Sequence, residues 1–327
     1  MKVGKLTVLD LEELVFKNLK SSRKEVISSP EIGGDCAIID FGDKVAYLST
    51  DPITGTSKGI GKLAININCN DIATGGVEPV GVMLTILLPP GTTKNEVTEI
   101  MREAEEECKK LNVTIMGGHT EVTTAVNRVV ISATAIGIGE KKSCKDKEKV
   151  ICGDRIIITK GIGIEGTGII AYEKESELQD VIGESLLREA KDLLDKTSVV
   201  KDGLLAAKHV KGMHDVTEGG LLGAIWEITE FYKLGTKICY ENILIPISTK
   251  KICEYFKIDP LKLISSGTML MIVSEEKVEE LITVLKKEGI DAFDIGFLTK
   301  TKEKILSKNK IEYEILEPES DELYKVV

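Results

Sequence analysis

The stretch STDPITGTSKGIGKLAININCNDIATGG, residues Ser49–Gly76, joins a loop rich in glycine, serine and threonine to a segment rich in asparagine. The apolar residues of that segment keep the three-and-four spacing of one helical face, at Ile60, Leu63, Ala64 and Ile67. Gly75 and Gly76 follow, and glycine commonly ends a helix. The pattern therefore predicts a helix that begins near Ile60 and stops at these glycines.

The other face of this helix carries an unusual polar stripe. Lys62, Asn66 and Asn70 lie four residues apart and share one side of the helix, with Asp71 beside them. Asparagine is a poor helix former, and an aspartate in the last turn faces the negative end of the helix dipole, so each choice costs from a few tenths to about 1 kcal/mol. A solvated face would more commonly use Glu, Lys and Gln. The stripe therefore favours a functional face over a solvated one.

The size and charge of the chain exclude several classes of protein. Its 327 residues suffice for two domains, and a composition of 42% hydrophobic and 29% charged residues is typical of globular proteins. A net charge of -10, without a basic stripe that carries aromatic residues, argues against nucleic-acid binding. No apolar run is long enough to span a membrane, and Met1–Asp10 does not resemble a signal peptide. The seven cysteines form no CxxC pair, so we expect reduced thiols in a cytoplasmic protein.

Strand and helix patterns alternate in both halves of the chain. Gly81–Leu88 and Ile243–Ile247 are predicted strands, and Val45–Leu48 predicts a strand that delivers Asp51 at its end. The segment Thr93–Glu96 has the residues of a capping box and predicts the start of a helix.

A charged segment near the middle divides the chain. Residues 141–149, KKSCKDKEK, have the composition of a linker. Strands and amphipathic helices are mixed on both sides of it, which is typical of α+β domains. We therefore expect two domains of the α+β class, at residues 1–145 and 150–327.

Four aspartates lie beside glycines or at the predicted ends of strands and helices: Asp35, Asp51, Asp71 and Asp215. Magnesium prefers hard oxygen ligands and often takes one or two carboxylates together with phosphate oxygens and water. Aspartates that converge on one cleft could therefore hold magnesium along a triphosphate. Each alone is also a common turn former, and the sequence leaves both roles open.

Two glycine-rich segments match phosphate-binding motifs in part. Gly55–Leu63 approaches a P-loop, but it lacks the first glycine and has Leu63 where Ser or Thr is needed. Its backbone amides could still bind an anion at the helix start, with Lys62 as a point charge. The GxGxxG pattern of Gly161–Gly166 is not followed by a clear crossover helix, so we expect no dinucleotide site there.

The chain has three histidines, His119, His209 and His214, and neither a HExxH motif nor a clear Ser/His/Asp order. His119 and His214 each lie within a cluster of Gly, Thr and Asp or Glu. A structural and a catalytic role are equally supported for these two.

Five short motifs follow one another in the order of a known superfamily. They are Gly34-Asp35, Ser49-Thr50-Asp51, Asn70-Asp71, Gly117–Thr120 and His214–Gly220, where the family has a GDDA-like turn, TD, ND, a GGxT turn and DxTxGG. The chain thereby resembles the superfamily of aminoimidazole ribonucleotide (AIR) synthetase, formylglycinamidine synthase, selenide water dikinase, thiamine-monophosphate kinase and the hydrogenase-maturation protein HypE. The second half looks most like HypE, and the first half is nearer to AIR synthase-related relatives of HypE.

The resemblance implies an AIR synthase-like fold of two domains, the first with a mixed or antiparallel sheet that pairs in a homodimer. It further implies that ATP and Mg2+ bind between the domains and that a small-molecule or protein-borne acceptor is activated by phosphoryl transfer or dehydration. Hydrogenase maturation is one such setting. We expect no nucleic acid and no membrane among the partners.

The motifs and the resemblance together suggest roles for individual residues. The expected magnesium ligands are Asp35, Asp51, Asp71 and Asp215. The expected nucleotide-binding residues are Gly34, Lys62, Asn70, Gly117, Gly118, Thr120, Thr217, Gly219 and Gly220. His119 or Glu121 is the expected general base.

The sequence departs from HypE at three places. No cysteine follows Cys253, whereas HypE acts on a C-terminal cysteine, so HypE's own reaction is not expected. Cys36 replaces the second Asp of the GDDA-like turn, and His119 stands where HypE has Asp, which removes two metal ligands. Two other functions therefore stay open: a small-molecule kinase of the thiamine-monophosphate kinase type, and a regulatory or scaffolding homologue that has lost catalysis.

Overall fold

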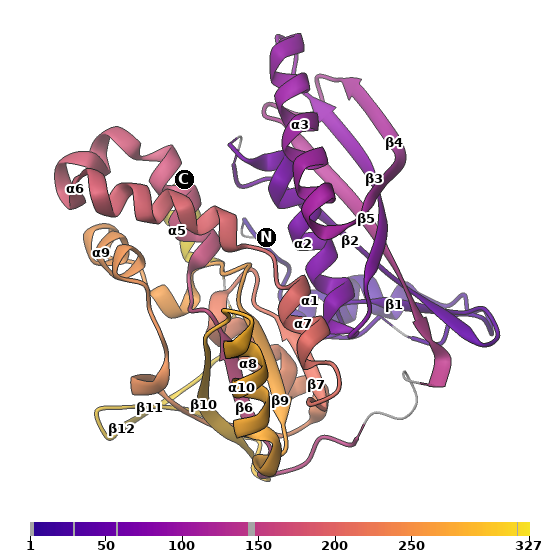
Figure 1. Ribbon diagram of the computed structural model, residues 1–327, viewed down its shortest axis with the longest axis vertical. Coiled ribbons are helices and arrows are strands. Elements are labelled where there is room, and N and C mark those ends of the chain that lie inside the picture. Colours follow the sequence, from indigo (N-terminus) through magenta and orange to yellow (C-terminus); the bar gives the residue numbers. More distant parts are fainter. Residues whose placement is uncertain (1–2, 29, 57, 143–147, 319) are drawn as a thin grey trace.

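Two sheets, one in each half of the chain, organise the fold (Figure 1). The structure is a computed structural model, and it describes residues 3–28, 30–56, 58–142, 148–318 and 320–327. None of the helices in these ranges is long and apolar enough to cross a membrane. The predicted α+β class is confirmed.

The first sheet has five strands in the order β1-β2-β5-β3-β4. They are β1 (Ala37–Asp40), β2 (Lys44–Ile53), β3 (Pro79–Leu88), β4 (Thr114–Val122) and β5 (Val130–Glu140). All neighbours are antiparallel except β3 and β4, which are parallel. β4 is an edge strand, and every residue in it except Ile115 is exposed.

Helix α3 (Lys94–Leu111) packs against helix α2 and lies on the same side of the first sheet (Figure 1). It begins with the predicted capping box. The Thr93 hydroxyl accepts a hydrogen bond from the amide of Glu96, and the Glu96 carboxylate accepts one from the amide of Thr93 at 2.7 Å. Two otherwise unpaired amides at the helix start are thereby satisfied.

Helix α2 (Ile60–Thr74) has the bounds predicted from its apolar spacing. Every residue in it except Lys62 is buried. The cause is that α7 (Val200–Ala206) and β7 (Gly212–Asp215) of the second half cover the side that the first sheet leaves free. Asn66 and Asn70 of the polar stripe therefore lie between the two halves and away from solvent, whereas Lys62 is partly exposed.

The second sheet has seven strands in the order β12-β11-β8-β10-β6-β9-β7. Besides β7 they are β6 (Arg155–Thr159), β8 (Gly235–Cys239), β9 (Met269–Val273), β10 (Ala292–Thr299), β11 (Lys304–Lys308) and β12 (Ile311–Glu314). Three helices pack on one another and form a group beyond one end of this sheet in Figure 1: α5 (Ile164–Glu173), α6 (Glu175–Asp192) and α9 (Ile247–Phe256).

Strand β6 serves two hydrophobic cores because its side chains alternate between the two faces of the sheet. Ile156 and Ile158 pack in one core with helix α8 (Gly220–Tyr232). Ile157 belongs to the other core, which also contains helix α10 (Val278–Lys287) and the apolar side of α2. Burial of each isoleucine contributes roughly 1.5–3 kcal/mol, so this shared core fixes α2 against the second half.

Three local predictions were wrong. Asp51 lies inside β2, which continues to Ile53, because the β2–β5 pairing extends past it. Residues 117–120 are not a turn but part of β4, where Gly118 lies so close to β3 that a Cβ there would be 1.8 Å from the Leu84 carbonyl oxygen. The segment 243–247 forms no strand, because Pro246 leads directly into α9. The predicted domain boundary stays a prediction, since residues 143–147 lie outside the described ranges.

Candidate functional site

Helix α2 and strand β2 bring two of the predicted aspartates together. The hydroxyl of Ser49 on β2 donates a hydrogen bond to the carboxylate of Asp71 in the last turn of α2. Asn68 fixes the backbone of Asp51, since its amide oxygen accepts from the Asp51 amide at 2.8 Å and its amide nitrogen donates to the Asp51 carbonyl at 3.3 Å. Asn68 therefore ties the backbone of β2 to α2 at Asp51.

The other two aspartates come from the segment before β1 and from the end of β7. Asp35 and Asp215 offer oxygen atoms within 4.8 Å of each other and of a ring nitrogen of His214. Asp71 interacts electrostatically with Asp215, Asp51 and Asp35. All four predicted metal ligands therefore lie in one cluster between the halves of the chain.

Burial and mutual repulsion shift the protonation of this cluster. Burial raises the pKa of Asp71 well above its usual value, and the charges of Asp215, Asp51 and Asp35 add to the shift. Burial also raises the pKa of Asp215 to about 7, with Asp35 as the next cause. The pKa of Asp51 is raised by burial as well. A bound cation would favour the ionised forms and remove the repulsion.

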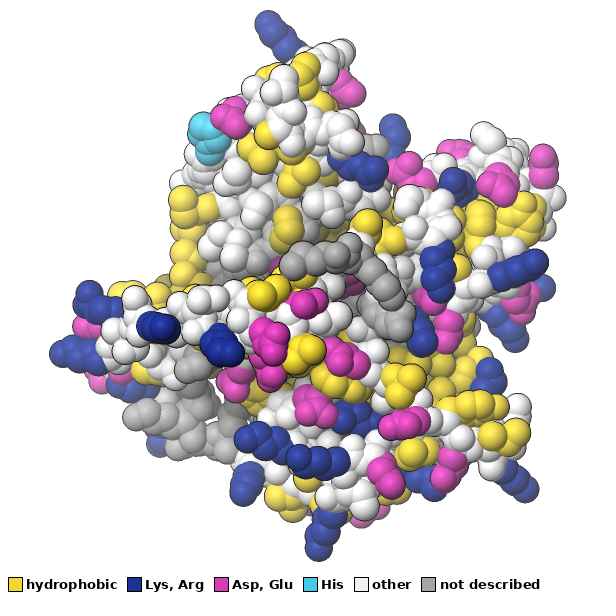
Figure 2. All heavy atoms as spheres, turned by 180° about the vertical axis from the view of Figure 1, so that it is seen from behind, with side chains coloured by type: hydrophobic (Ala, Val, Ile, Leu, Met, Phe, Trp, Pro, Cys, Tyr) yellow, Lys and Arg dark blue, Asp and Glu magenta, His cyan; other side chains and the backbone are white. Residues whose placement is uncertain are grey.

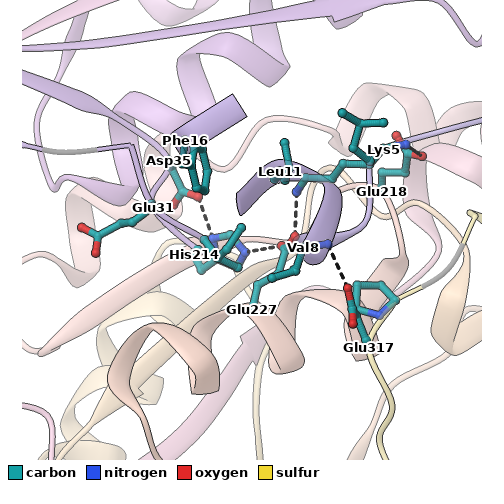
Figure 3. Close-up of a pocket in the computed structure, with 15 residues that line it drawn as sticks. Lys5, Val8, Leu11, Phe16, Glu31, Asp35, His214, Glu218, Glu227 and Glu317 are labelled. Carbon is teal, nitrogen blue, oxygen red and sulfur yellow. Dashed lines mark hydrogen bonds and ion pairs between the residues drawn. The ribbon is translucent and has the colours of Figure 1, made fainter. Parts of the chain in front are cut away.

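A row of alternating acidic and basic side chains borders the cluster (Figure 3). The Nδ1 atom of His214 lies 2.7 Å from Asp35 Oδ1, and its Nε2 atom lies 3.2 Å from Glu227 Oε2. The other oxygen of Glu227 accepts a hydrogen bond from Lys5 Nζ at 2.7 Å. Figure 3 shows His214 between the two carboxylates and Lys5 on the N-terminal segment that crosses them.

His214 acts as a counter-ion in this arrangement. Although burial opposes it, the carboxylates of Asp35 and Glu227 raise the pKa of His214 well above its usual value. Burial of Glu227 is likewise outweighed by His214 and Lys5, which lower its pKa to about 2. An imidazolium donates through both ring nitrogens and has no lone pair for a metal, so His214 is not a metal ligand while it holds these two partners.

Two cavities meet at the carboxylate cluster. One of about 530 Å³ is lined by all four aspartates, by Gly34 and by β1 and β2 residues. The other, of about 740 Å³, extends towards α5 and the last residues of the chain. Both are lined by Lys5, Asp51 and Thr217. In Figure 2 several acidic side chains lie together near the middle of one face of the molecule.

The cluster suits a hard divalent cation. The Oδ2 atom of Asp215 is buried and has no hydrogen-bond partner among the described residues. Such an atom costs roughly 1–3 kcal/mol unless something pairs with it, and a carboxylate oxygen is a ligand that Mg2+ prefers. The geometry therefore fits the predicted magnesium ligands.

Two residues predicted to orient phosphates lie elsewhere. Lys62 forms an ion pair with Asp195 beside a separate cavity. Asn70 donates to the Thr197 carbonyl at 2.9 Å and accepts from the Val199 amide at 2.7 Å, so its side chain joins the two halves. Neither residue lines the two cavities at the aspartates.

The predicted β4 residues also lie away from the aspartates within one chain. His119 and Glu121 are exposed on this edge strand, 3.2 Å apart, next to Thr120. The backbone of Gly117 and Gly118 pairs with β3.

In the second half, the amide of Gly219 is bound by Asp321 at 2.7 Å, and that of Gly220 by the Thr217 carbonyl at 3.0 Å. These two amides are therefore not free to bind an anion in this conformation. Of the predicted nucleotide-binding residues, Gly34 and Thr217 line the cavities.

The sequence analysis missed three residues of the site. Asn68 was overlooked because it lies off the stripe of Lys62 and Asn70 on the helix. Glu227 is a buried carboxylate among the apolar residues of helix α8, and a charge at a position with apolar helical spacing could have been noticed. Lys5 carries no comparable signal, since it lies in a short segment before the first helix.

The comparisons with family models agree with the five motifs. The model of the AIR synthase related protein, N-terminal domain, matches residues 33–139. The model of the AIR synthase related protein, C-terminal domain, matches residues 152–308. The two matched ranges contain the first sheet and most of the second.

Relatives and solved structures share this fold. A Methanocaldococcus jannaschii protein described as a hydrogenase expression/formation protein is 28% identical over 304 residues, 91% of this chain and 89% of the relative. Carbamoyl dehydratase HypE of Bradyrhizobium diazoefficiens is 24% identical over 274 residues, 81% and 77% of the two chains. The structure of hydrogenase maturation protein HypE in complex with ATP has a TM-score of 0.70 at 18% identity. The match covers 98% of this chain and 94% of that chain. The structure of AaThiL complexed with AMPPCP and TMP has a TM-score of 0.75 at 18% identity. The match covers 96% of this chain and 98% of that chain.

Proposed function

The chain belongs to the AIR synthase related family, and on this premise we propose that it is an ATP-dependent enzyme that uses Mg2+. In this proposal it activates an acceptor by phosphoryl transfer or dehydration. The observation that carries the proposal is the meeting of Asp35, Asp51, Asp71 and Asp215 at the junction of two cavities. Magnesium bound to such carboxylates neutralises the charge that develops on a transferring phosphoryl group.

In this proposal the residues of the site have the following roles. Asp51, Asp71 and Asp215 would hold Mg2+, and Asp35 would aid them while its charge is balanced by His214. Gly34 and Thr217 would form the walls on either side of the phosphates. Lys62 and Asn70 would keep the two halves in register, which is what their contacts with Asp195, Thr197 and Val199 support.

The acceptor is either a small molecule or a group carried by another protein. Relatives named as hydrogenase expression/formation protein and carbamoyl dehydratase support a place in hydrogenase maturation. Likeness to AaThiL in its complex with AMPPCP and TMP supports a small-molecule kinase as the second candidate. ADP release stimulated specifically by thiamine monophosphate would favour the kinase.

A homodimer through the first sheet is part of the proposal. The exposed edge of β4 supports it, because an unpaired strand edge with apolar side chains favours association. Met116 and Val122 are 50% and 62% exposed on this strand. His119 and Glu121 lie outside both cavities of their own chain, so a role as general base would require that β4 of one chain reach the site of its partner.

Calorimetry with a nonhydrolysable ATP analogue tests the nucleotide site. We expect binding that requires Mg2+ and that weakens at least about tenfold, or 1.4 kcal/mol, in Asp71→Asn. Asp195→Asn is the matched control, because Asp195 is exposed, lies away from the cluster and pairs with Lys62. Magnesium-independent binding, or equal affinities of the two variants, would refute the proposed site.

ATP turnover separates an enzyme from a scaffolding homologue. The proposal predicts ADP formation by the purified protein that disappears in Asp51→Asn. If the protein binds the analogue but releases no ADP from ATP in the presence of any acceptor, the scaffolding function is supported instead.

A further inference from the structure

The larger of the two cavities has a buried end that the nucleotide proposal does not use. This cavity, of about 740 Å³, begins at Asp51 and Thr217 and ends against helix α5 and residues 323–327. Glu165 on α5 and Ser266 in the segment before β9 lie on its wall. They are 3% and 0% exposed.

Two polar side chains at this end are incompletely paired. The hydroxyl and the amide of Ser266 lie beside the Glu165 carboxylate and lower its pKa, but neither Oε2 of Glu165 nor Oγ of Ser266 makes a well-formed hydrogen bond among the described residues. A buried polar atom without a partner costs roughly 1–3 kcal/mol, so two of them on one cavity wall indicate that a ligand completes the site. Burial also raises the pKa of Glu165 to about 7, so this carboxyl changes charge readily near neutral pH.

The glycines of the GxGxxG pattern explain how Glu165 comes to lie there. A Cβ at Gly163 would be 2.8 Å from Thr249, and one at Gly166 would be 2.5 Å from Leu263. The glycines let the start of α5 approach Thr249 and Leu263 closely, and Glu165 lies between Gly163 and Gly166 at the start of this helix. The motif thus positions a carboxyl at the cavity wall.

The charge at this end favours a nitrogen cation. The carboxylates of Asp321 and Glu218 act on Glu165 and make its surroundings negative. Of the two cations on the wall, Lys5 is paired with Glu227, and Arg128 is exposed. The remaining wall is largely apolar and includes Ile169, Ile264 and Leu323.

We propose that this cavity is the acceptor subsite and that it takes a small molecule with an apolar body and a terminal amine, amidine or guanidine. The N–H groups of that terminus donate to Glu165 and Ser266, and the apolar body packs on the isoleucines. This inference rests on the proposed function, since it assigns the acceptor to one cavity and the nucleotide to the other.

Pentanamidine is a suitable probe, with pentanoate and pentanol as its anionic and neutral counterparts. We expect calorimetry on the protein saturated with Mg2+ and the ATP analogue to show millimolar binding of pentanamidine and no binding of the other two. Glu165→Gln should weaken the binding about tenfold and Ser266→Ala about threefold, as expected for lost hydrogen bonds to a charged group. Glu173→Gln, the same change at the far end of α5, should leave it unchanged.

Three outcomes of the titration with pentanamidine and its counterparts would overturn the inference. They are absence of pentanamidine binding, equal binding of pentanoate, and equal effects of Glu165→Gln and Glu173→Gln. A loss of ATP-analogue affinity in Glu165→Gln would likewise refute it, by assigning the cavity to the nucleotide. If Glu165→Gln fails to fold, Glu165→Asp is the second variant. It keeps the charge, so it should weaken pentanamidine binding less than Ser266→Ala does. If the wild type fails to bind the analogue, the proposed function fails, whereas analogue binding without amidine binding refutes only this inference.

Discussion

His214 on β7 of the second half lies 2.7 Å from the carboxylate of Asp35 in the first half, and the pair is almost completely buried. No other ion pair of Asp35 is present in the described part of the chain. The same imidazole reaches Glu227 on α8, so one cation balances two carboxylates that would otherwise repel the rest of the aspartate cluster. This pair therefore links the stability of the interface between the halves to the charge of the site.

Replacing His214 by a neutral residue should destabilise the protein strongly. We expect His214→Gln to lower the free energy of unfolding by roughly 3–5 kcal/mol, because it leaves Asp35 buried and uncompensated. Urea unfolding monitored by circular dichroism measures this. Adding Asp35→Asn to the variant should restore part of the loss. His209→Gln is the matched control, since His209 lies 3.7 Å from an exposed glutamate and should change stability little. A double variant less stable than His214→Gln would contradict this account.

Without metal, the stability of the protein should fall as the pH rises from 6 to 8. The pKa of Asp215 is about 7 in the folded chain, above its usual 3.8, so the folded state binds more protons than the unfolded state between these values. The contribution of Asp215 to stability therefore falls as the pH rises from 3.8 towards 7 and changes little above pH 7. His214 acts in the same direction above its usual 6.5, while Glu227, with a pKa of about 2, matters only in acid.

The measurement is the melting temperature with and without Mg2+ and the ATP analogue. We expect a decrease of several degrees from pH 6 to pH 8 in the metal-free protein and the largest stabilisation by ligand at pH 8, where the carboxylates are ionised. Asp215→Asn should flatten the decrease. A melting temperature that rises across this range would show that the cluster does not hold protons as described.

The edge of β4 should set the oligomeric state. We expect sedimentation equilibrium to give a dimer at micromolar concentration and a monomer for Val122→Lys, because a lysine on an exposed strand edge opposes pairing. Ile311→Lys is the control, since Ile311 is 57% exposed on β12, in the other sheet. A monomeric wild type, or dissociation by Ile311→Lys alone, would exclude β4 as the interface.

The order of short motifs was enough to predict the fold and to single out four aspartates that the fold brings together, because each motif depends on residues close together in the sequence. Apolar spacing likewise predicted α2 and the capping box of α3. The partners of the site were not predictable in this way. Lys5 and Glu227 are 222 positions apart, and nothing local to either residue indicates the other.

Helical spacing also showed correctly that Lys62 and Asn70 share a face of α2, but it contains no information on what covers that face. Lys62 and Asn70 could face phosphates only if this face of α2 lined an open cleft. The second half fills that place with Asp195, Thr197 and Val199. Asn70 satisfies backbone groups of that segment, and Asn66 donates to the Thr197 hydroxyl.

Asn70 provides the sharpest test of this distinction. Its side chain satisfies the Thr197 carbonyl and the Val199 amide, so Asn70→Ala leaves two buried backbone groups without partners and should lower the free energy of unfolding by roughly 2–4 kcal/mol. The Mg2+-dependent affinity of the folded variant for the ATP analogue should stay within about threefold of the wild type, since Asn70 does not line either cavity. Asn18→Ala, an exposed change, should alter neither quantity. If Asn70 instead orients phosphates, the affinity will fall tenfold or more while the stability remains, and the stripe will have to be assigned to the nucleotide after all.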